Sequence, residues 1–406
     1  HGNLLSNQKM IAEAMNTHSD CVIVGWLPLF HDMGLIGNLL QPFCLGARCI
    51  LMSPTSFVMN PIRWLEAISK YKATISGGPN FAYELCLSRT TEEQRRNLNL
   101  NSWKIAFNGA EKIRAETLEK FSNTFSKYGF SADAFFPCYG MAESTLFISG
   151  VDHKKAPTIL SVDKNELLID NIRIKKQRIA GHSNNLLIDH GIDQTVTDDN
   201  NIVSFVSCGV TYQSCQFKIV DQYTHTECAE NKVGEIWVTG SHISRGYNND
   251  IELSKATFNN VIAGHTNNLG YLRTGDLGFF HQGELYVAGR IKDLIIIKGR
   301  NHYPYDLELT AVNADPLINE SISAAFSVDS NDEERLIVIV EIKKRLIEYL
   351  DIDAVKQSIK RAISIHHAVQ VKEVVLIRSR IPMTSSGKIQ RKKCCQLYIQ
   401  DELDII

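Results

Sequence analysis

Short apolar runs alternate with segments of helical spacing up to Phe136, and this alternation limits the possible folds more than any other feature. The runs are rich in β-branched side chains, as expected of strands inside a sheet. The expected strands are Cys21–Val24, Ala47–Met52, Ala73–Ser76, Trp103–Phe107 and Asp133–Phe136. The expected helices are Pro61–Lys70, Thr91–Asn97 and Ala115–Lys127. A repeated strand–helix order predicts an α/β fold based on a mostly parallel sheet.

Two further changes of pattern divide the rest of the chain. Residues 155–205 are rich in Asp, Asn and Lys, and we expect an insertion there. From Val206 short strand-like runs predominate, and Phe279–Phe280 and Glu284–Val287 flank a predicted hairpin turn. We therefore predict a large α/β domain over 1–205, its β-rich subdomain over 206–292, and a small, mobile α+β domain over 293–406.

Composition excludes several classes of partner. The net charge is −2 and the pI about 6.7, so we expect no nucleic acid or anionic membrane as the main partner. The longest apolar stretch, Cys21–Phe30, is shorter than the roughly 20 residues that a membrane span needs, so we expect no stable membrane insertion. The ten cysteines form no C-x-x-C pair and no zinc-like spacing. Unpaired thiols favour a cytoplasmic protein.

Polar residues follow two of the predicted strands. Asn108–Glu111 come after one strand, and Tyr139–Glu143 come after the next. Because ligands of α/β sheets bind beyond the carboxyl ends of strands, both segments could line one pocket. Tyr139 could stack on a base, and Glu143 could hold Mg²⁺ through its carboxylate. The alternative for Glu143 is a carboxylate that favours the start of a helix.

Two turns in the later part of the chain carry charged residues. Asp276, after Arg273-Thr274-Gly275, could present both carboxylate oxygens to neighbouring hydroxyls such as a ribose diol, although a turn-capping aspartate gives the same pattern. The motif Gly289-Arg290-Ile291-Lys292-Asp293 precedes an apolar run and then Gly299–Pro304. A polar junction of this kind suits a hinge, and the alternative is an ordinary charged turn.

A Gly387-Lys388 pair occurs in a polar segment near the C-terminus. The phosphate-binding pattern G-x-x-x-x-G-K-S/T would need Gly at 382 and Ser or Thr at 389, but the chain has Pro382 and Ile389. What remains is a loop lysine, which could be delivered to a phosphate as a point charge. The alternative is a solvated surface lysine.

The order of these motifs resembles the core motifs of the adenylate-forming superfamily. The motifs are Asn-Gly-Ala-Glu at 108–111, Tyr-Gly-Met-Ala-Glu at 139–143, Arg-Thr-Gly-Asp at 273–276, Gly-Arg-Ile-Lys-Asp at 289–293 and Pro-x-Thr-x-x-Gly-Lys-x-x-Arg at 382–391. Within the superfamily, Trp26–Gly34 and Leu294–Pro304 resemble segments of the fatty acyl-AMP ligases. Residues 155–205 lie about where those ligases carry an extra segment.

The chain departs from the superfamily pattern in two ways. Ala142 stands where many members have Thr, which puts the α-phosphate contact in doubt. The superfamily also carries a Thr/Ser/Gly-rich phosphate loop just upstream of a segment like His1–Leu4, where this sequence begins. We therefore expect the sequence to be a piece that lacks its front part.

The resemblance implies a ligase that uses ATP and Mg²⁺ to convert a fatty acid to acyl-AMP, with release of pyrophosphate. The acyl group would then pass to an acyl carrier protein or a polyketide synthase carrier domain. Lys388 would act on the transition-state charge, and His31 would lie near the carboxylate unless it is a structural histidine. Glu143 would be the metal ligand. The implied nucleotide contacts are Asn108, Gly109, Ala110, Glu111, Tyr139, Gly140, Met141, Ala142, Asp276 and Arg290.

Two alternatives stay open at this point. The first is a fatty acyl-CoA synthetase on the same fold, which would form acyl-CoA with free CoA. The second is a non-catalytic fragment or binding module, because the phosphate loop lies outside the sequence.

Overall fold

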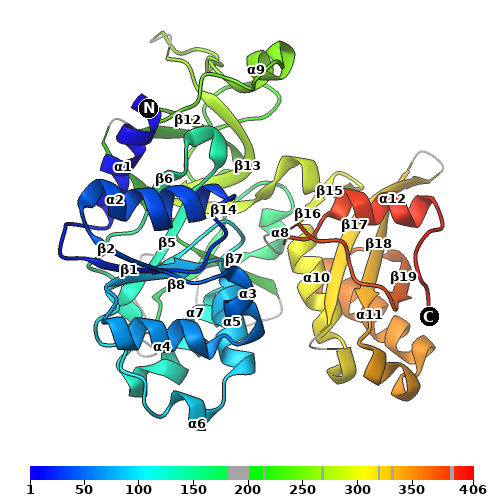
Figure 1. The fold of residues 1–406 in the computed structure, drawn as a ribbon. Coiled ribbons are helices and arrows are strands. Elements are labelled where there is room, and N and C mark those ends of the chain that lie inside the picture. Colours follow the sequence, from blue (N-terminus) through cyan, green and yellow to red (C-terminus); the bar gives the residue numbers. More distant parts are fainter. Residues whose placement is uncertain (182–200, 214, 267–268, 319–320, 331–332, 385–387) are drawn as a thin grey trace. The chain divides into compact units, whose positions relative to one another are not determined.

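The computed structural model describes residues 1–181, 201–213, 215–266, 269–318, 321–330, 333–384 and 388–406 (Figure 1). The chain divides into two units. Unit 1 contains the described residues of 1–163, 172–197 and 202–288, and unit 2 contains those of 164–171, 198–201 and 289–406. The change of unit at Gly289 falls on the first residue of the predicted hinge motif. The predicted boundaries at 205/206 and 292/293 stay predictions.

A seven-stranded sheet forms the centre of unit 1, in the order β10-β6-β5-β4-β3-β1-β2. Its strands are β1 (Val22–Gly25), β2 (Arg48–Leu51), β3 (Ile75–Gly78), β4 (Ile105–Asn108), β5 (Phe135–Gly140), β6 (Phe147–Gly150) and β10 (Val210–Thr211). The four pairings among β1 to β5 are parallel, and β6 and β10 add to the sheet as antiparallel strands. The predicted α/β fold with a parallel sheet is therefore confirmed.

The helices of unit 1 follow from the spacing of their apolar residues. In α7 (Ala115–Phe125) the buried Leu118, Phe121 and Phe125 recur every three or four positions, which gives one apolar stripe. The predicted Thr91–Asn97 helix is shorter, because α6 covers only Glu92–Arg95 behind a Thr91–Gln94 capping box. The other helices are α1 (Gly2–Ala14), α2 (Gln41–Leu45), α3 (Pro54–Met59), α4 (Ile62–Tyr71), α5 (Asn80–Arg89), α9 (Ile251–Thr257) and the π-helix η1 (Met33–Leu40).

Two smaller antiparallel sheets complete unit 1. One has the order β11-β12-β13-β14, with β11 (Gln216–Val220), β12 (Gly234–Thr239), β13 (Leu272–His281) and β14 (Glu284–Arg290), whose last two residues belong to unit 2. The turn of the expected β13–β14 hairpin is Gln282-Gly283, and both residues have positive φ, as a type I′ turn requires. The other has the order β8-β7-β9, with β7 (Thr158–Asp163), β8 (Ile174–Ile179) and β9 (Ile202–Val206). It lies in the predicted insertion 155–205, of which residues 182–200 are outside the described residues.

Unit 2 is built on a mixed sheet with helices on both faces. Its main elements are β17 (Ile322–Ser330), β18 (Glu333–Glu341), β19 (Val371–Ile377), α10 (Pro304–Asn313), α11 (Ile352–His367) and α12 (Arg391–Ile399). Shorter elements are α8 (Lys164–Leu167), β15 (Ile295–Ile297) and β16 (Arg300–His302). Successive residues of a strand point to opposite faces, so Val338 belongs to the core shared with α10 and α11, whereas Ile339 belongs to the core shared with α12. This arrangement confirms the predicted small α+β fold.

Aromatic rings fill much of the core of unit 1. The Trp64 ring is fully buried and contacts the rings of Trp26, Phe57, Tyr83 and Trp103. Its indole Nε1 donates to the Ser76 hydroxyl over 2.7 Å. No helix in the described part of the chain combines the length and apolar character that a membrane crossing requires.

We expect Trp64→Ala to lower the free energy of unfolding of unit 1 by about 3–5 kcal/mol, because it removes a large buried ring and leaves a cavity. All four tryptophans lie in unit 1, so urea denaturation followed by tryptophan fluorescence reports on this unit. Phe43→Ala is the control, because Phe43 is 82% exposed. Equal midpoints for the two variants would contradict this account of the core.

Candidate active site

The carboxyl ends of β4 and β5 bring two predicted motif segments together. These strands are parallel neighbours, so their ends meet at one edge of the sheet. A Cβ atom at Gly109 would lie 2.8 Å from the Cys138 carbonyl oxygen, so only glycine lets the loop after β4 approach β5 this closely. Asn108 is fully buried, and its Oδ1 has no hydrogen-bond partner among the described residues.

Glu111 contacts the start of helix α5. One of its carboxylate oxygens accepts the backbone N–H of Phe81 over 2.6 Å, in the first turn of α5. A carboxylate in this position satisfies a helix N–H and interacts favourably with the helix dipole. The preceding residue, Ala110, has φ of 67°, a left-handed conformation that a non-glycine residue rarely adopts. The tight turn and the Glu111 contact together fix the path of the loop.

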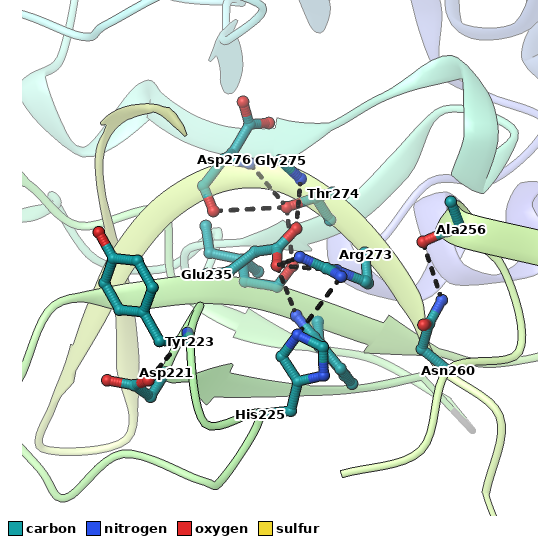
Figure 2. Close-up of polar contacts among 12 residues, drawn as sticks. Asp221, Tyr223, His225, Glu235, Ala256, Asn260, Arg273, Thr274, Gly275 and Asp276 are labelled. Carbon is teal, nitrogen blue, oxygen red and sulfur yellow. Dashed lines mark hydrogen bonds and ion pairs between the residues drawn. The ribbon is translucent and has the colours of Figure 1, made fainter. Parts of the chain in front are cut away.

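A buried hydrogen bond joins the second motif to the third. The Tyr139 hydroxyl donates to Oδ2 of Asp276 over 2.8 Å, and both residues are almost inaccessible to solvent. Tyr139 lies in β5 of the large sheet and Asp276 in β13 of the antiparallel sheet. Figure 2 shows the Arg273–Asp276 turn, in which the Thr274 hydroxyl accepts the Asp276 N–H over 3.1 Å. Tyr139 and Asp276, which are 137 positions apart in the sequence, are therefore in direct contact.

Glu143 is held by two contacts from the segment after β12. Its carboxylate Oε1 accepts the Tyr247 hydroxyl over 2.8 Å, and its backbone carbonyl accepts the Ser244 N–H over 2.8 Å. Burial and the neighbouring Glu143 raise the pKa of Tyr247 to about 12, so the phenol stays a donor at neutral pH. Glu143 lies in a single 3-10 turn, Ala142–Ser144, which does not continue into a longer helix.

The chain doubles back sharply after Glu143. Thr145 has φ of 70° and ψ of −61°, which is strained for a β-branched residue. Its hydroxyl donates to the His242 carbonyl oxygen over 2.6 Å and helps to hold this conformation. A Cβ atom at Gly140 would lie 1.8 Å from the Leu146 carbonyl oxygen, so the two arms of the bend leave no room for a side chain. Strain of this kind concentrates at functional sites.

His31 pairs with its neighbour Asp32. Nδ1 of His31 lies 2.5 Å from Oδ1 of Asp32, which also caps η1 by accepting the Met33 N–H over 2.7 Å. The Met33 N–H also lies 3.3 Å from Nδ1 of His31, so His31, Asp32 and the start of η1 form one polar cluster. A Cβ at Gly37 in η1 would lie 3.5 Å from Leu146, so this helix lies beside the bend that follows Glu143. π-Helical turns are rare and are often found at functional sites.

Unit 2 carries the remaining predicted residues. The Thr384 N–H donates to the Lys388 carbonyl oxygen over 2.8 Å, and residues 385–387 between them lie outside the described residues. Arg391 follows at the start of α12, where it binds both carboxylate oxygens of Glu308 over 2.7 Å and Oδ2 of Asp293 over 3.0 Å. Burial opposes its charge, but Glu308 and Asp293 outweigh this effect and raise the pKa of Arg391. Arg290 is the exposed last residue of β14.

The chain matches known families over most of its length. Residues 1–176 match the family described as AMP-binding enzyme, and residues 292–406 match the Disco-interacting protein 2-like AMP domain. The medium-chain fatty acid–acyl-carrier-protein ligase JamA of Moorena producens is 43% identical over all of this chain and 65% of its own length. A crystal structure of a fatty acyl-adenylate ligase from Legionella pneumophila, in complex with acyl adenylate and pyrophosphate, is 38% identical over 100% of this chain and 67% of that chain, with a TM-score of 0.67. The chain belongs to the fatty acyl-AMP ligases.

A third relative supports this assignment by its fold. A structure from a study of the Escherichia coli and L. pneumophila fatty acyl-adenylate ligases has a TM-score of 0.82 at 30% identity, and it covers 99% of this chain and 66% of that one. The chain spans about two thirds of the length of these fatty acyl-AMP ligases. The family resemblance read from the motif order is therefore confirmed.

Within unit 1 the structure brings Tyr139, Asp276 and the loop after β4 to one region, whereas Lys388 and Arg290 belong to unit 2. Sequence reasoning missed Glu235 and Tyr247, which contact the predicted motifs through the fold. An acidic residue inside the apolar run Gly234–Thr239 was the available signal for Glu235. No local pattern marks Tyr247, because its contact with Glu143 joins residues 104 positions apart.

We expect Arg391→Met to destabilise unit 2 by about 3–5 kcal/mol, because it leaves the buried Glu308 carboxylate without its cation. Hydrogen exchange of the β17–β19 amides would measure the loss. The control is Arg378→Met, which breaks a half-exposed pair with Asp404 at 3.6 Å and should cost at most about 1 kcal/mol. Similar exchange rates in both variants would argue against a structural role for the Arg391 cluster.

We expect the stability of unit 1 to fall as the pH drops from about 6.5 to 4. Burial lowers the pKa of His242 from 6.5 to about 4, so the unfolded chain binds this proton more readily than the folded one. Above pH 6.5 His242 is neutral in both states and unit 1 keeps its full free energy of unfolding. Near pH 4 this free energy is lower by about 3 kcal/mol. Urea denaturation of wild type and His242→Gln across this range, followed by tryptophan fluorescence, isolates the contribution. Parallel stability curves would show that His242 titrates normally.

Proposed function

We propose that the protein activates a fatty acid with ATP to form acyl-AMP and pyrophosphate, and then passes the acyl group to an acyl carrier protein or a polyketide synthase carrier domain. The buried Tyr139–Asp276 hydrogen bond carries the proposal, because it places a candidate base-stacking ring next to a candidate ribose-binding carboxylate. The relatives agree with this activity: JamA is described as a ligase of medium-chain fatty acids and acyl carrier protein, and the L. pneumophila structure contains acyl adenylate and pyrophosphate. The ten free cysteines favour a cytoplasmic location.

The nucleotide would lie along the ends of β4 and β5. Tyr139 and the segment from Asn108 to Glu111 would frame the adenine, together with Gly140, Met141 and Ala142. The two oxygens of the Asp276 carboxylate offer about four acceptor positions, so it can accept from Tyr139 and from ribose hydroxyls at the same time. Arg290 would contact the ribose or a phosphate. The buried Asn108 amide is a further polar group for the base.

The donor set suits Mg²⁺ bound through one carboxylate. Among the described residues no group of three or more His, Cys, Asp or Glu side chains could hold a metal ion, which leaves single carboxylates such as Glu143. Mg²⁺ in nucleotide sites is commonly held by one or two carboxylates, with water and phosphate oxygens completing its shell. The Tyr247 hydroxyl fixes Oε1 of Glu143 and thereby orients the carboxylate. When bound, the ion would neutralise phosphate charge.

In the adenylation step an oxygen of the fatty acid carboxylate attacks the α-phosphorus of ATP, and the bond to the pyrophosphate oxygen breaks. Positioning and charge stabilisation dominate such reactions. Lys388 would stabilise the charge that develops on the phosphate and carboxylate oxygens. His31, oriented by Asp32, would lie near the carboxylate at the acyl end of the site.

A product assay tests the proposal. The full-length protein is incubated with radiolabelled fatty acid and ATP-Mg²⁺, alone, with CoA, and with a phosphopantetheinylated carrier protein. Acyl-AMP that accumulates in the presence of CoA and is consumed by the carrier protein supports the proposal. Conversion to acyl-CoA would instead assign an acyl-CoA synthetase, and the absence of any adenylate would point to a non-catalytic module.

We expect Lys388→Ala to lower the adenylation rate by about 100- to 1,000-fold, because one preorganised charge contact with a transition state is worth roughly that factor. Pyrophosphate release under saturating substrates measures the rate. Lys393→Ala is the matched control, since this exposed lysine on α12 belongs to no predicted motif. Wild-type rates in Lys388→Ala would remove this lysine from the mechanism.

A further inference from the structure

Glu235 is a buried carboxylate that none of the motifs includes. It lies in β12, is 2% exposed, and accepts hydrogen bonds from three residues (Figure 2). Its Oε1 accepts the Gly275 N–H over 3.0 Å. Its Oε2 accepts Nε of Arg273 over 3.0 Å and the Trp237 indole N–H over 2.9 Å. A second nitrogen of the Arg273 guanidinium lies 3.0 Å from the same oxygen.

The β12–β13 ladder explains why a carboxylate is needed here. Glu235 pairs with Leu277 and Trp237 pairs with Arg273, so a single residue of β12 faces three residues of β13. The three residues Thr274–Asp276 therefore arch out of the ladder as an irregular bulge opposite Ile236. Gly275 has φ of 69°, and its N–H finds no partner in a regular ladder. The Glu235 carboxylate accepts this N–H and thereby ties the Thr274–Asp276 arch to β12.

The arch decides where the Asp276 carboxylate lies. Gly275 directly precedes Asp276, so the Glu235 contact fixes the peptide that carries this carboxylate. The Thr274 hydroxyl adds a second support, because it donates to the Ile236 carbonyl oxygen over 2.7 Å while accepting the Asp276 N–H. The Arg273 guanidinium, stacked over Trp237, balances the charge of Glu235 in this buried position.

We propose that Glu235 is a positioning residue for ribose recognition: it holds the Thr274–Asp276 arch so that Asp276 can engage both ribose hydroxyls, and thereby makes the protein select ribonucleoside over deoxyribonucleoside triphosphates. This inference rests on the proposed function, because it takes Asp276 as the ribose contact. Glu235 itself is buried and would not contact the nucleotide, so it would act by holding Asp276 in position.

The test compares ATP with 2′-deoxy-ATP and 3′-deoxy-ATP in wild type and in Glu235→Gln. An amide has one acceptor oxygen in place of two, so either Gly275 or Arg273 loses its acceptor while the shape of the side chain is kept. We expect wild type to prefer ATP in kcat/KM by roughly tenfold or more, as expected for charge-assisted hydrogen bonds to hydroxyls. In Glu235→Gln we expect this ratio to approach one, with KM for ATP raised more than kcat is lowered.

Two further variants separate positioning from general stability. Trp237→Phe removes one donor to Oε2 and keeps the Gly275 contact, so its ATP preference should equal that of wild type even if its melting temperature falls. Glu235→Asp keeps the charge near Arg273 but is one methylene shorter, so it should fold and lose the preference, and it serves if Glu235→Gln does not fold. Glu227→Gln removes an exposed carboxylate that pairs with Lys218 and His265 but does not contact the Thr274–Asp276 arch, so it should leave the ATP preference unchanged.

The outcomes are distinct. A wild-type protein that forms no adenylate contradicts the proposed function itself. A wild type that adenylates but does not distinguish ATP from the deoxynucleotides removes Asp276 as the ribose contact and overturns the inference. Folded Glu235→Gln and Glu235→Asp proteins that keep the wild-type preference also overturn it. Loss of the preference in both, with its retention in Trp237→Phe and Glu227→Gln, supports it.

Discussion

The hydrogen bond between the Tyr139 hydroxyl and the Asp276 carboxylate is the contact on which the geometry of unit 1 most depends. It joins the parallel sheet to the antiparallel one, and it is buried, so water does not compete for either partner. Loss of either group would remove one buried hydrogen bond that water cannot replace, which is more costly than the bond itself is favourable. The two sheets therefore hold one relative arrangement at this point, and residues more than a hundred positions apart meet there.

Other supports of the region also come from distant parts of the sequence. Glu143 depends on Tyr247, and the arch before Asp276 depends on Glu235. In both cases a residue outside the predicted motif fixes the orientation of a group inside it. The strained Thr145 fits this view, because its hydroxyl is held by the carbonyl oxygen of His242, a residue 97 positions away.

Local patterns predicted much of the fold. The apolar runs predicted the parallel strands, and Gln282-Gly283 predicted the turn of the β13–β14 hairpin. Both predictions succeed because strand burial and turn geometry depend on residues that are neighbours in the sequence. The motif order also gave the family. The π-helix over Met33–Leu40 and the added strand β6 could not be read this way, since the first depends on packing and the second on pairing between distant strands. For the same reason the predicted site contained Glu143 and Asp276 but not Tyr247 or Glu235.

The Arg391 cluster of unit 2 has one more consequence, which concerns solubility. In the sheet order β17-β18-β19, β17 is an edge strand. Edge strands carry unpaired N–H groups with which a strand of another chain can form hydrogen bonds. Glu308, held by Arg391, accepts the N–H of Ala325 in β17 over 3.0 Å. One position of the edge is therefore already occupied by a buried carboxylate from α10. A strand of another copy that extended the sheet along β17 would have to displace this charge, so the cluster that anchors α12 also opposes strand addition at this position of the β17 edge.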